Sequence, residues 1–147
     1  MENKSIYAIR YHDICCGHRV VGHESKCRHL HGHNYRFHFK IQQVQSDHFL
    51  DNLGRVLDFS VIKSVLCEWL EMNWDHKTLI WEKDPKLAEL QILFPGSIVV
   101  LPVNPTAENM AIYFTEQVAP DLLAEHFCSL VWLRIDETRK CSVEYNI

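Results

Sequence analysis

The sequence predicts an α+β protein with an antiparallel sheet, in which two strands come first, helices follow and two strands come last. Two observations carry this prediction. Residues 34–44 and 140–147 alternate apolar and polar side chains with a period of two, as a half-buried strand does. Between them, residues 61–70 and 110–118 repeat apolar side chains every three or four positions, which indicates amphipathic helices. Strands grouped around a helical centre are typical of α+β folds.

The first two strands are expected at residues 5–14 and 34–44. In the first, Tyr7, Ile9 and Tyr11 share one parity, although neighbouring apolar residues blur the alternation. In the second, the apolar residues share odd parity, which continues back to His31 and His33 unless Gly32 introduces a bulge. The apolar residues of this odd face are Tyr35, Phe37, Phe39 and Ile41.

A first helix is expected after the turn at residues 51–54, because Asp58 or Ser60 can cap its N-terminus. An N-terminal cap accounts fully for Asp58, so we assign it a structural role. The apolar stripe of this helix contains Val61, Ile62, Val65, Leu66, Trp69 and Leu70.

The middle of the chain predicts two more helices and a short strand. Asp84 followed by Pro85 indicates a short helix that ends near Leu93, and residues 97–103 form an apolar strand. Asn104 and Pro105 then begin a third helix. Its inner stripe contains Met110, Ala111, Phe114 and Val118.

Two strands are expected at the C-terminal end, at residues 129–138 and 140–147. In the first of them Val131, Leu133 and Ile135 share one parity with Glu137, which places a carboxylate at the end of an apolar stripe. A buried carboxylate needs partners, whereas one at a strand end can be solvated. The pattern alone leaves both possibilities open for Glu137.

Length and charge restrict the class of protein. A chain of 147 residues fits a single domain, which we expect to span residues 1–147. The formal net charge of −4 argues against a nucleic-acid-binding protein that neutralises phosphates through a basic face. No apolar run approaches the roughly 20 residues that a membrane-spanning helix requires, so we expect no membrane segment.

The six cysteines predict free thiols rather than a disulfide framework. The N-terminal residues mix charged and apolar side chains and do not resemble a signal peptide, so a reducing cytoplasm is the expected compartment. Five of the six cysteines are interpreted as small buried apolar residues: Cys15, Cys16, Cys67, Cys128 and Cys141.

A metal site is predicted from the ten histidines, several of which cluster between residues 12 and 38. His31 and His33 are two residues apart, so in a strand both imidazoles point to the same side. His18 from the preceding strand is the most plausible third ligand, although His29 has the parity to compete. Three imidazoles would leave one coordination position open, which is typical of catalytic zinc sites.

Cys27 differs from the other cysteines in its surroundings. Lys26, Arg28 and His29 flank it, and a metal ion at the histidines would lie close. Positive potential favours a thiolate over a thiol, and a thiolate can act as a base.

Six short motifs follow one another along the chain: His18-Arg19, Cys27-x3-His31-Gly32-His33-Asn34-Tyr35, Val56-Leu57-Asp58-Phe59, Asp75-His76-Lys77, Asn104-Pro105-Thr106-Ala107-Glu108-Asn109 and Glu137-Thr138. No single motif would be specific, but together and in this order they resemble the 6-pyruvoyltetrahydropterin synthase family over about residues 7–145. The match is best to its 6-carboxytetrahydropterin synthase branch, which acts in queuosine biosynthesis.

The resemblance implies a tunnelling fold, in which an antiparallel sheet of about four main strands carries helices on one face. Subunits of this family join their sheets into a trimeric barrel, and two trimers stack as a hexamer. The resemblance also favours His18, His31 and His33 as ligands of a catalytic Zn²⁺.

The resemblance further implies a catalytic group made of Cys27, Asp75 and His76, with Cys27 removing a proton from the substrate. We give His76 the proton-transfer role and Asp75 an orienting role. Without the resemblance, we would interpret Asp75 and His76 as a polar turn that ends a helix. Glu137 is expected to grip the pterin ring, and Thr106 is a weaker candidate for pterin binding, since capping also explains it.

The reaction that the resemblance implies converts 7,8-dihydroneopterin triphosphate into 6-carboxy-5,6,7,8-tetrahydropterin, acetaldehyde and triphosphate. Arg19, Lys26, Arg28 and Lys77 are the unranked candidates for the triphosphate. The alternative reaction is that of 6-pyruvoyltetrahydropterin synthase, which eliminates triphosphate without breaking the carbon chain. The typical motif of that enzyme has a longer gap between cysteine and His-Gly-His than the three residues here.

A noncatalytic zinc module is a third possibility. In it Cys15 or Cys16 would join Cys27, His31 and His33 to close a tetrahedral structural site.

Overall fold

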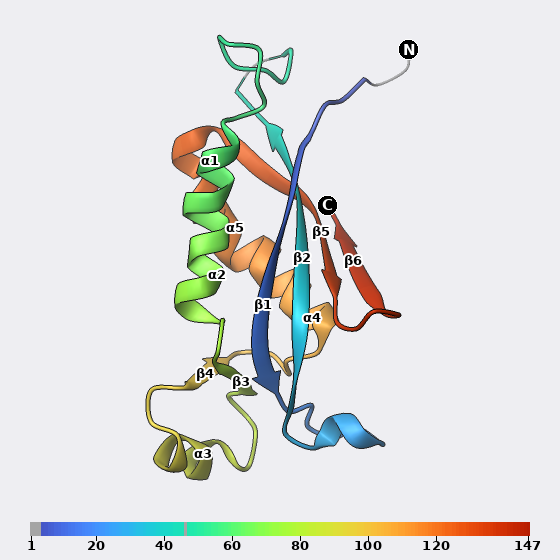
Figure 1. Cartoon of the computed structure of the whole chain (residues 1–147), viewed down its shortest axis with the longest axis vertical. Coiled ribbons are helices and arrows are strands. Elements are labelled where there is room, and N and C mark those ends of the chain that lie inside the picture. The colour runs from blue at the N-terminus through green and yellow to red at the C-terminus, as the bar shows by residue number, and fades with distance from the viewer. Residues whose placement is uncertain (1–3, 46) are drawn as a thin grey trace.

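The computed structural model describes residues 4–45 and 47–147, and its centre is one six-stranded sheet with the strand order β4-β3-β1-β2-β5-β6 (Figure 1). The strands are β1 (Ala8–His18), β2 (His31–Gln43), β3 (Thr78–Trp81), β4 (Ile98–Leu101), β5 (Cys128–Asp136) and β6 (Ser142–Asn146).

The four long strands are antiparallel neighbours, as predicted, but the sheet as a whole is mixed. β3 pairs parallel to β1 through Gly17 and His18, and β4 pairs parallel to β3. The expected antiparallel sheet of about four main strands is therefore present, and the short strands β3 and β4 extend it by parallel pairs at the β1 edge. β3 has four residues, which is too short to show an alternating pattern, and its pairing joins segments 61 residues apart (Gly17 with Thr78).

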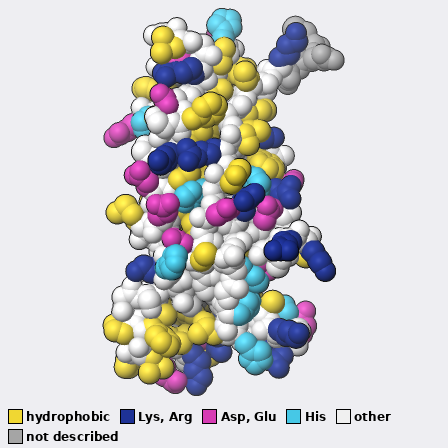
Figure 2. Space-filling model, in the orientation of Figure 1, with side chains coloured by type: hydrophobic (Ala, Val, Ile, Leu, Met, Phe, Trp, Pro, Cys, Tyr) yellow, Lys and Arg dark blue, Asp and Glu magenta, His cyan; other side chains and the backbone are white. Residues whose placement is uncertain are grey.

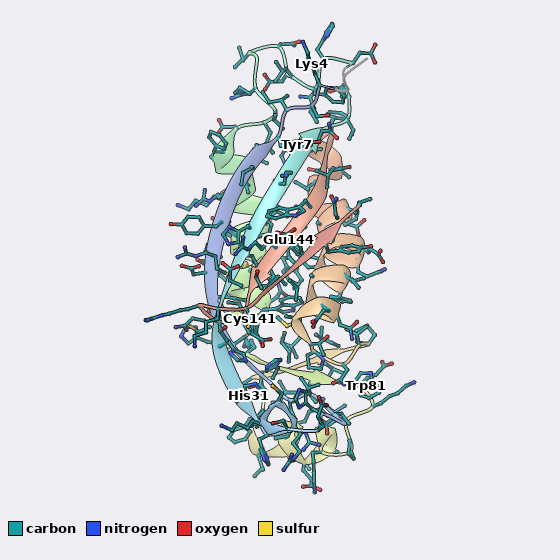
Figure 3. All side chains as sticks on the ribbon, turned by 90° about the vertical axis from the view of Figure 1, so that its right-hand side faces the viewer. Lys4, Tyr7, His31, Trp81, Cys141 and Glu144 are labelled. Carbon is teal, nitrogen blue, oxygen red and sulfur yellow. The ribbon has the colours of Figure 1, made fainter. Side chains whose placement is uncertain are left out.

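Two helical segments cover the same face of the sheet, as expected (Figures 1 and 3). One runs through α1 (Phe59–Ile62), the π-helical η2 (Lys63–Cys67) and α2 (Glu68–Asn73); the other runs through α4 (Ala107–Tyr113), the π-helical η3 (Phe114–Val118) and α5 (Ala119–Leu123). Asp58 caps α1 by accepting a hydrogen bond from the Ser60 N–H at 2.8 Å, so the predicted cap is confirmed.

The helix α3 (Leu87–Leu93) lies apart from these layers, beside β3 and β4 at one end of the molecule (Figure 1). It contributes no buried residue. Ile92, Leu93 and Phe94 are exposed, and Figure 2 shows apolar side chains gathered over this end of the molecule. The short 3₁₀ turns η1 (Lys26–Arg28) and η4 (Ala124–His126) complete the helical elements.

The core lies between the sheet and the two helical segments. The predicted odd face of β2 points into it, where Phe37 and Phe39 are fully buried against Phe114 and Phe37 also packs on Trp74. The core face of β1 is the even one. Ile9 and Tyr11, which share one parity in the sequence, are exposed on the opposite, outer face of β1.

A β-bulge changes the expected alternation in β5. The register with β2 shifts between Lys40 and Ile41, so that Leu130 and Leu133 both face the core. Val131 is partly exposed, although the sequence groups it with Leu133. A bulge inserts one residue and reverses the alternation beyond it. After the bulge, Leu133 and Ile135 face the core, as the sequence predicts.

All six cysteines are free thiols, but their burial differs from the expectation at two positions. Cys16, Cys67 and Cys128 are buried, whereas Cys15 and Cys141 are exposed. Cys15 lies on the outer face of β1 because it alternates with Cys16. Among the described residues, no helix combines the length and apolar character needed to cross a bilayer.

Candidate metal centre and active site

The backbone of β1 and β2 brings the three predicted histidines to one place. His18 at the end of β1 is the ladder partner of His31 at the start of β2. Gly17 pairs with Gly32 without a register shift, so no bulge interrupts β2 and His33 stays on the same face as His31. A Cβ atom at Gly32 would lie 3.1 Å from the Cys16 carbonyl oxygen, which explains why this close-packed position holds a glycine.

One ring nitrogen from each of His18, His31 and His33 lies within 4.8 Å of the other two. The Nδ1 of His18 lies 2.6 Å from the Pro105 carbonyl oxygen, and the Nδ1 of His31 lies 2.6 Å from the His29 carbonyl oxygen. A carbonyl oxygen only accepts hydrogen bonds, so both Nδ1 atoms donate and a neutral ring has its lone pair on Nε2. These two Nε2 atoms are 3.0 Å apart, an arrangement that a shared cation stabilises.

Burial favours the neutral form of two of the three imidazoles, those of His18 and His33, and a metal ligand must be neutral. Burial lowers the pKa of His18 to about 4, although its hydrogen bond to Pro105 acts in the opposite direction. Burial also lowers the pKa of His33, against the nearby Glu137 carboxylate. The Nε2 of His33 is buried and has no hydrogen-bond partner among the described residues. The donor set therefore fits a metal ion.

Tyr35 supports the cluster from the core side. Its ring stands edge-on to His18, with 5.9 Å between centroids, and its hydroxyl lies 3.2 Å from the His18 Nδ1. Burial raises the pKa of the Tyr35 phenol far above its ordinary value, so this neighbour stays uncharged. The environment on that side favours neutral His18 further.

A cavity of about 290 Å³, called here the Cys27 cavity, opens beside His18. Cys27 reaches it from η1, Thr106 from the start of α4 and Glu137 from the end of β5. The structure thus brings the predicted base and both predicted pterin-binding residues next to one metal-ligand candidate. The full lining is His18, Val20, His23, Cys27, Thr106, Ala107, Glu108 and Glu137.

The carboxylate of Glu137 lies between the cavity and the histidines. Its Oε1 is 3.9 Å from the His33 Nε2, and a quarter (25%) of its side chain is exposed. Thr106 is the N-cap of α4, because its hydroxyl oxygen accepts a hydrogen bond from the Asn109 N–H at 3.1 Å. Glu108 lies in the first turn of α4 and forms part of the cavity wall.

Asp75 and His76 form a hydrogen-bonded pair in the turn that precedes β3. The His76 Nδ1 lies 2.9 Å from the Asp75 Oδ2, and 78% of the His76 side chain is exposed. His76 has a positive φ of 58°, a conformation that non-glycine residues seldom adopt and that is often found at functional sites. The turn is held to Cys15, whose N–H donates to the Asp75 Oδ1 at 2.8 Å and whose carbonyl accepts the His76 N–H at 2.6 Å.

The charge of Asp75 is stabilised in this arrangement. Burial raises the pKa of Asp75, but hydrogen bonds from the Cys15 N–H and from His76 outweigh burial and leave the pKa below its ordinary value. The carboxylate therefore fixes the His76 ring through Nδ1 and leaves the exposed Nε2 to exchange protons.

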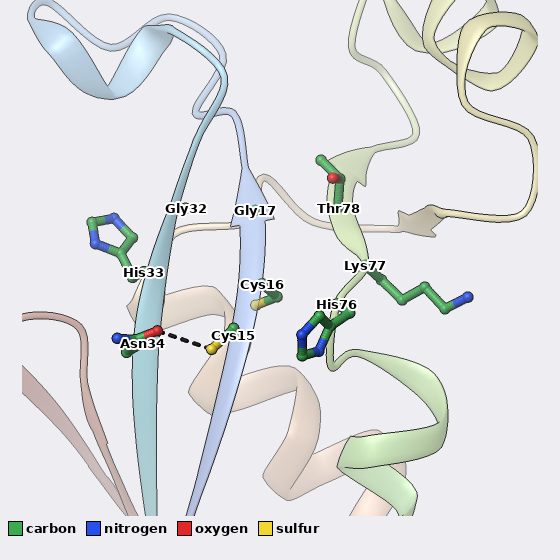
Figure 4. A pocket seen from close by; sticks show the side chains of 9 residues that line it. All are labelled: Cys15, Cys16, Gly17, Gly32, His33, Asn34, His76, Lys77 and Thr78. Atoms are coloured by element: carbon green, nitrogen blue, oxygen red, sulfur yellow. Dashed lines mark hydrogen bonds between the residues drawn. The ribbon is translucent and has the colours of Figure 1, made fainter.

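Within one chain, the described residues place Cys27 and the Asp75–His76 pair on different cavities. His76 borders a second cavity of about 460 Å³, the His76 cavity, together with His33 and Cys15 (Figure 4). In that view the rings of His33 and His76 lie on opposite sides of the β1–β2 pair, and the Lys77 side chain points away. The three predicted catalytic residues thus divide into Cys27 on one side and Asp75 with His76 on the other.

The triphosphate candidates differ in how far their charges are already engaged. The Arg19 guanidinium makes two hydrogen bonds of 2.8 Å to Asp84, and the Lys77 Nζ donates to the Gly96 carbonyl at 2.8 Å. Arg28 donates to backbone carbonyls of residues 24 and 25. Arg19 is therefore neutralised by a buried carboxylate and is a poor phosphate ligand.

The site argues against a closed structural zinc module. In the described part of the chain, the histidine cluster includes no cysteine. The Cys15 thiol instead donates to the Asn34 Oδ1 at 2.9 Å, as Figure 4 shows. Burial raises the pKa of the Cys16 thiol to about 12, which disfavours the thiolate that a metal requires.

Sequence patterns missed two of the groups that orient the histidines, the carbonyls of His29 and Pro105. Both are backbone atoms, so no side-chain identity marks them. His29 itself is exposed and supplies its carbonyl rather than its ring. The Asn104-Pro105 helix start was a visible signal, but it says nothing about which distant ring its carbonyl meets.

Comparisons with known proteins agree with this geometry. The sequence profile of the family described as 6-pyruvoyl tetrahydropterin synthase matches residues 8–147. The 6-carboxy-5,6,7,8-tetrahydropterin synthase of Rickettsia typhi is 34% identical over 90% of this chain and 94% of its own length, and that of Rickettsia felis is 33% identical over 87% and 91%.

Solved structures share the fold at lower identity. An uncharacterized protein from Wolinella succinogenes superposes with a TM-score of 0.79 at 20% identity, covering 98% of this chain and 99% of its own. The 6-pyruvoyl tetrahydropterin synthase of Caenorhabditis elegans superposes with a TM-score of 0.68 at 20% identity, covering 97% and 96%. The fold expected from the sequence is therefore confirmed as that of the tetrahydropterin synthases.

Proposed function

We propose that this chain, which belongs to the 6-pyruvoyl tetrahydropterin synthase family, is a zinc-dependent 6-carboxy-5,6,7,8-tetrahydropterin synthase, a carbon–carbon lyase. Its substrates are 7,8-dihydroneopterin triphosphate and one water molecule, and its products are 6-carboxy-5,6,7,8-tetrahydropterin, acetaldehyde and triphosphate. The product serves queuosine biosynthesis. The observation that carries the proposal is the position of Cys27 and Glu137 on one cavity with His18, beside three converging imidazoles.

His18, His31 and His33 are the residues that would hold the zinc ion. When bound there, zinc supplies Lewis-acid polarisation of the substrate oxygens, which makes the adjacent carbon acidic. The chain prepares for it by holding two rings through Nδ1, so that the Nε2 atoms of His18 and His31 face the site.

Cys27 takes the proton from the substrate side chain. It is partly exposed on the wall of its cavity, which His18 also lines. Glu137 orients the pterin by accepting hydrogen bonds from its 2-amino and ring N–H groups, two parallel bonds that suit a carboxylate. Thr106 lies near the same ring, in addition to capping α4.

His76 exchanges protons with the substrate through Nε2, and Asp75 holds its ring. Because neither Asp75 nor His76 borders the Cys27 cavity, we propose that a neighbouring copy of the chain brings the two halves together. A homo-oligomer, expected to be a hexamer of two stacked trimers, supplies that neighbour. The six free thiols suit a reducing compartment, and we place the enzyme in the cytoplasm.

The alternative reaction is triphosphate elimination, as in the 6-pyruvoyltetrahydropterin synthases. The gap of only three residues between Cys27 and His31 favours the carboxytetrahydropterin branch. The distinction between the two reactions is whether the carbon chain breaks.

The test is turnover of 7,8-dihydroneopterin triphosphate by the purified protein, before and after zinc is removed and restored. We expect zinc-dependent release of acetaldehyde together with 6-carboxytetrahydropterin. A 6-pyruvoyl product without acetaldehyde would establish the alternative, and the absence of any turnover by zinc-loaded protein would refute both.

A further inference from the structure

The three residues that follow His18 are held by contacts that the proposed chemistry does not use. Arg19, Val20 and Val21 leave β1 directly after the metal-ligand candidate. Each of them is attached to a different segment: Arg19 to Asp84, Val20 to the backbone of Cys27 and Val21 to Asn104.

Asn104 makes the most complete of these attachments. Its side-chain Oδ1 accepts a hydrogen bond from the Val21 N–H at 3.1 Å, and its Nδ2 donates to the Val21 carbonyl at 2.9 Å. One amide thus satisfies both backbone groups of Val21, as a strand neighbour would. Its own carbonyl accepts hydrogen bonds from the Thr106 N–H at 2.8 Å and the Asn109 side chain at 3.0 Å, which fix Asn104 at the start of α4.

The next residue, Pro105, supplies the carbonyl that accepts the His18 Nδ1 hydrogen bond. Asn104 therefore acts on the His18 ring in two ways. It holds Val21, which lies three residues after His18, and it is bonded directly to Pro105, whose carbonyl sets the orientation of the ring. Val20, the residue before Val21, donates its N–H to the Cys27 carbonyl at 2.9 Å. A shift of Val21 would displace both His18 and Cys27.

Asp84 makes the second attachment, from the segment between β3 and β4. Its side chain is fully buried and binds the Arg19 guanidinium through both oxygens, while Oδ1 also accepts the Lys86 N–H at 2.8 Å. A bidentate pair of this kind fixes direction as well as distance.

We propose that Asn104, assisted by Asp84, is a positioning residue that holds His18 and Cys27 in the arrangement needed for metal binding and proton removal. The inference rests on the proposed function in one respect, that the three imidazoles bind the metal. It gives a role to the segment between β3 and α4, from which both Asp84 and Asn104 come.

The test uses Asn104→Ala, with Asn73→Ala as the matched control. Asn73 also donates its side-chain amide to a backbone carbonyl, that of Trp69 at 2.9 Å, but it lies at the end of α2, which contributes no residue to the histidine cluster. Apo-protein is titrated with Co²⁺, whose visible spectrum reports the geometry of the ligands. We expect the cobalt affinity of Asn104→Ala to fall by about 10–100-fold with an altered spectrum, as for other residues that orient ligands indirectly. Asn73→Ala should match the original protein.

The outcomes separate the two proposals. If Asn104→Ala has a lower unfolding temperature but unchanged affinity and spectrum, its role is merely structural and the inference is wrong. If Asn104→Ala does not fold, Asp84→Asn replaces it, with a lowered affinity expected and an unchanged one contrary to the inference. Original protein that binds cobalt but never turns over substrate would refute the reaction alone. Original protein that takes up no cobalt would refute the metal site and the inference together.

Discussion

The histidine cluster and the Asp75–His76 turn lie on either side of β1 and β2 and differ in how completely one chain builds them. His18 is buried, and its ring nitrogens are committed to a carbonyl and to the site. His76 is mostly exposed, with its partner Asp75 held by the backbone of Cys15. The first region is a finished binding site, whereas the second is a prepared acid–base pair on a surface. This difference is the basis of our proposal that one chain forms the metal site and that a second copy completes the catalytic group.

Loss of a histidine from the cluster should have the largest effect. We expect His33→Ala to lose metal and to reduce turnover by at least about 10³-fold, because a Lewis-acid metal supplies several kcal/mol of transition-state stabilisation. The measurement is metal content by elemental analysis together with turnover. His29→Ala is the matched control, since the exposed His29 ring is dispensable and its carbonyl remains. Metal loss in His29→Ala instead would show that the ligand set is misassigned.

Cys27→Ala should separate proton removal from metal binding. Its metal content should stay at the level of the original protein, while turnover falls by about 10²–10⁴-fold, the usual contribution of a positioned base. Cys141→Ala removes an exposed thiol outside the Cys27 cavity and should leave turnover unchanged. Near-normal turnover by Cys27→Ala would refute the assignment of the base.

A mixing experiment tests whether the two regions meet between copies. Cys27→Ala and His76→Ala chains are each expected to be nearly inactive when pure. Co-expressed in equal amounts, they should recover about a quarter of the original activity, because random assembly pairs an intact Cys27 with an intact His76 at about one site in four. Mixed oligomers as inactive as the pure variants would place all three residues in a site within one chain.

The smallest effect concerns stability at the histidine end. Both Asp84 and Asp13 bind an arginine through two oxygens, but the Asp84 side chain is fully buried and 53% of that of Asp13 is exposed. Asp84→Asn should lower the free energy of unfolding of apo-protein by about 3 kcal/mol at pH 7, since it leaves a partly buried Arg19 unpaired. Asp13→Asn should cost less than about 1 kcal/mol. Urea denaturation measures both.

The pH dependence of this effect has a definite sign. Burial raises the pKa of Asp84, but the Arg19 hydrogen bonds and the Lys86 N–H outweigh burial, so that the pKa in the folded protein is lowered from 3.8. A lowered carboxyl pKa stabilises the folded state above the unfolded value and loses that contribution as pH falls through the folded value. The difference between Asp84→Asn and the original protein should therefore shrink below about pH 4. A constant difference down to pH 2 would contradict this account.

Local patterns in the sequence predicted most of the fold. The alternation in β2 and β6 and the three- and four-residue repeats of the long helices appear where they were expected, because each depends on which side of one element is buried. The short strand β3 and the bulge in β5 were not predicted, because both depend on pairing with distant segments. The exposed face of β1 was ambiguous for the same reason, since Tyr7 and Tyr11 are apolar enough for either side.

The sequence by itself determined that His31 and His33 share a face, because the two-residue period of a strand fixes side-chain direction. It also determined the types of residue available for chemistry. Only the tertiary structure decided that His18 meets them and that the carbonyls of Pro105 and His29 orient the rings of His18 and His31. It also decided that Asp75 and His76 border cavities other than that of Cys27. The physical reason is range: side-chain periodicity acts over a few residues, whereas a binding site is closed by contacts between distant segments, such as that of His18 with Pro105, 87 residues apart.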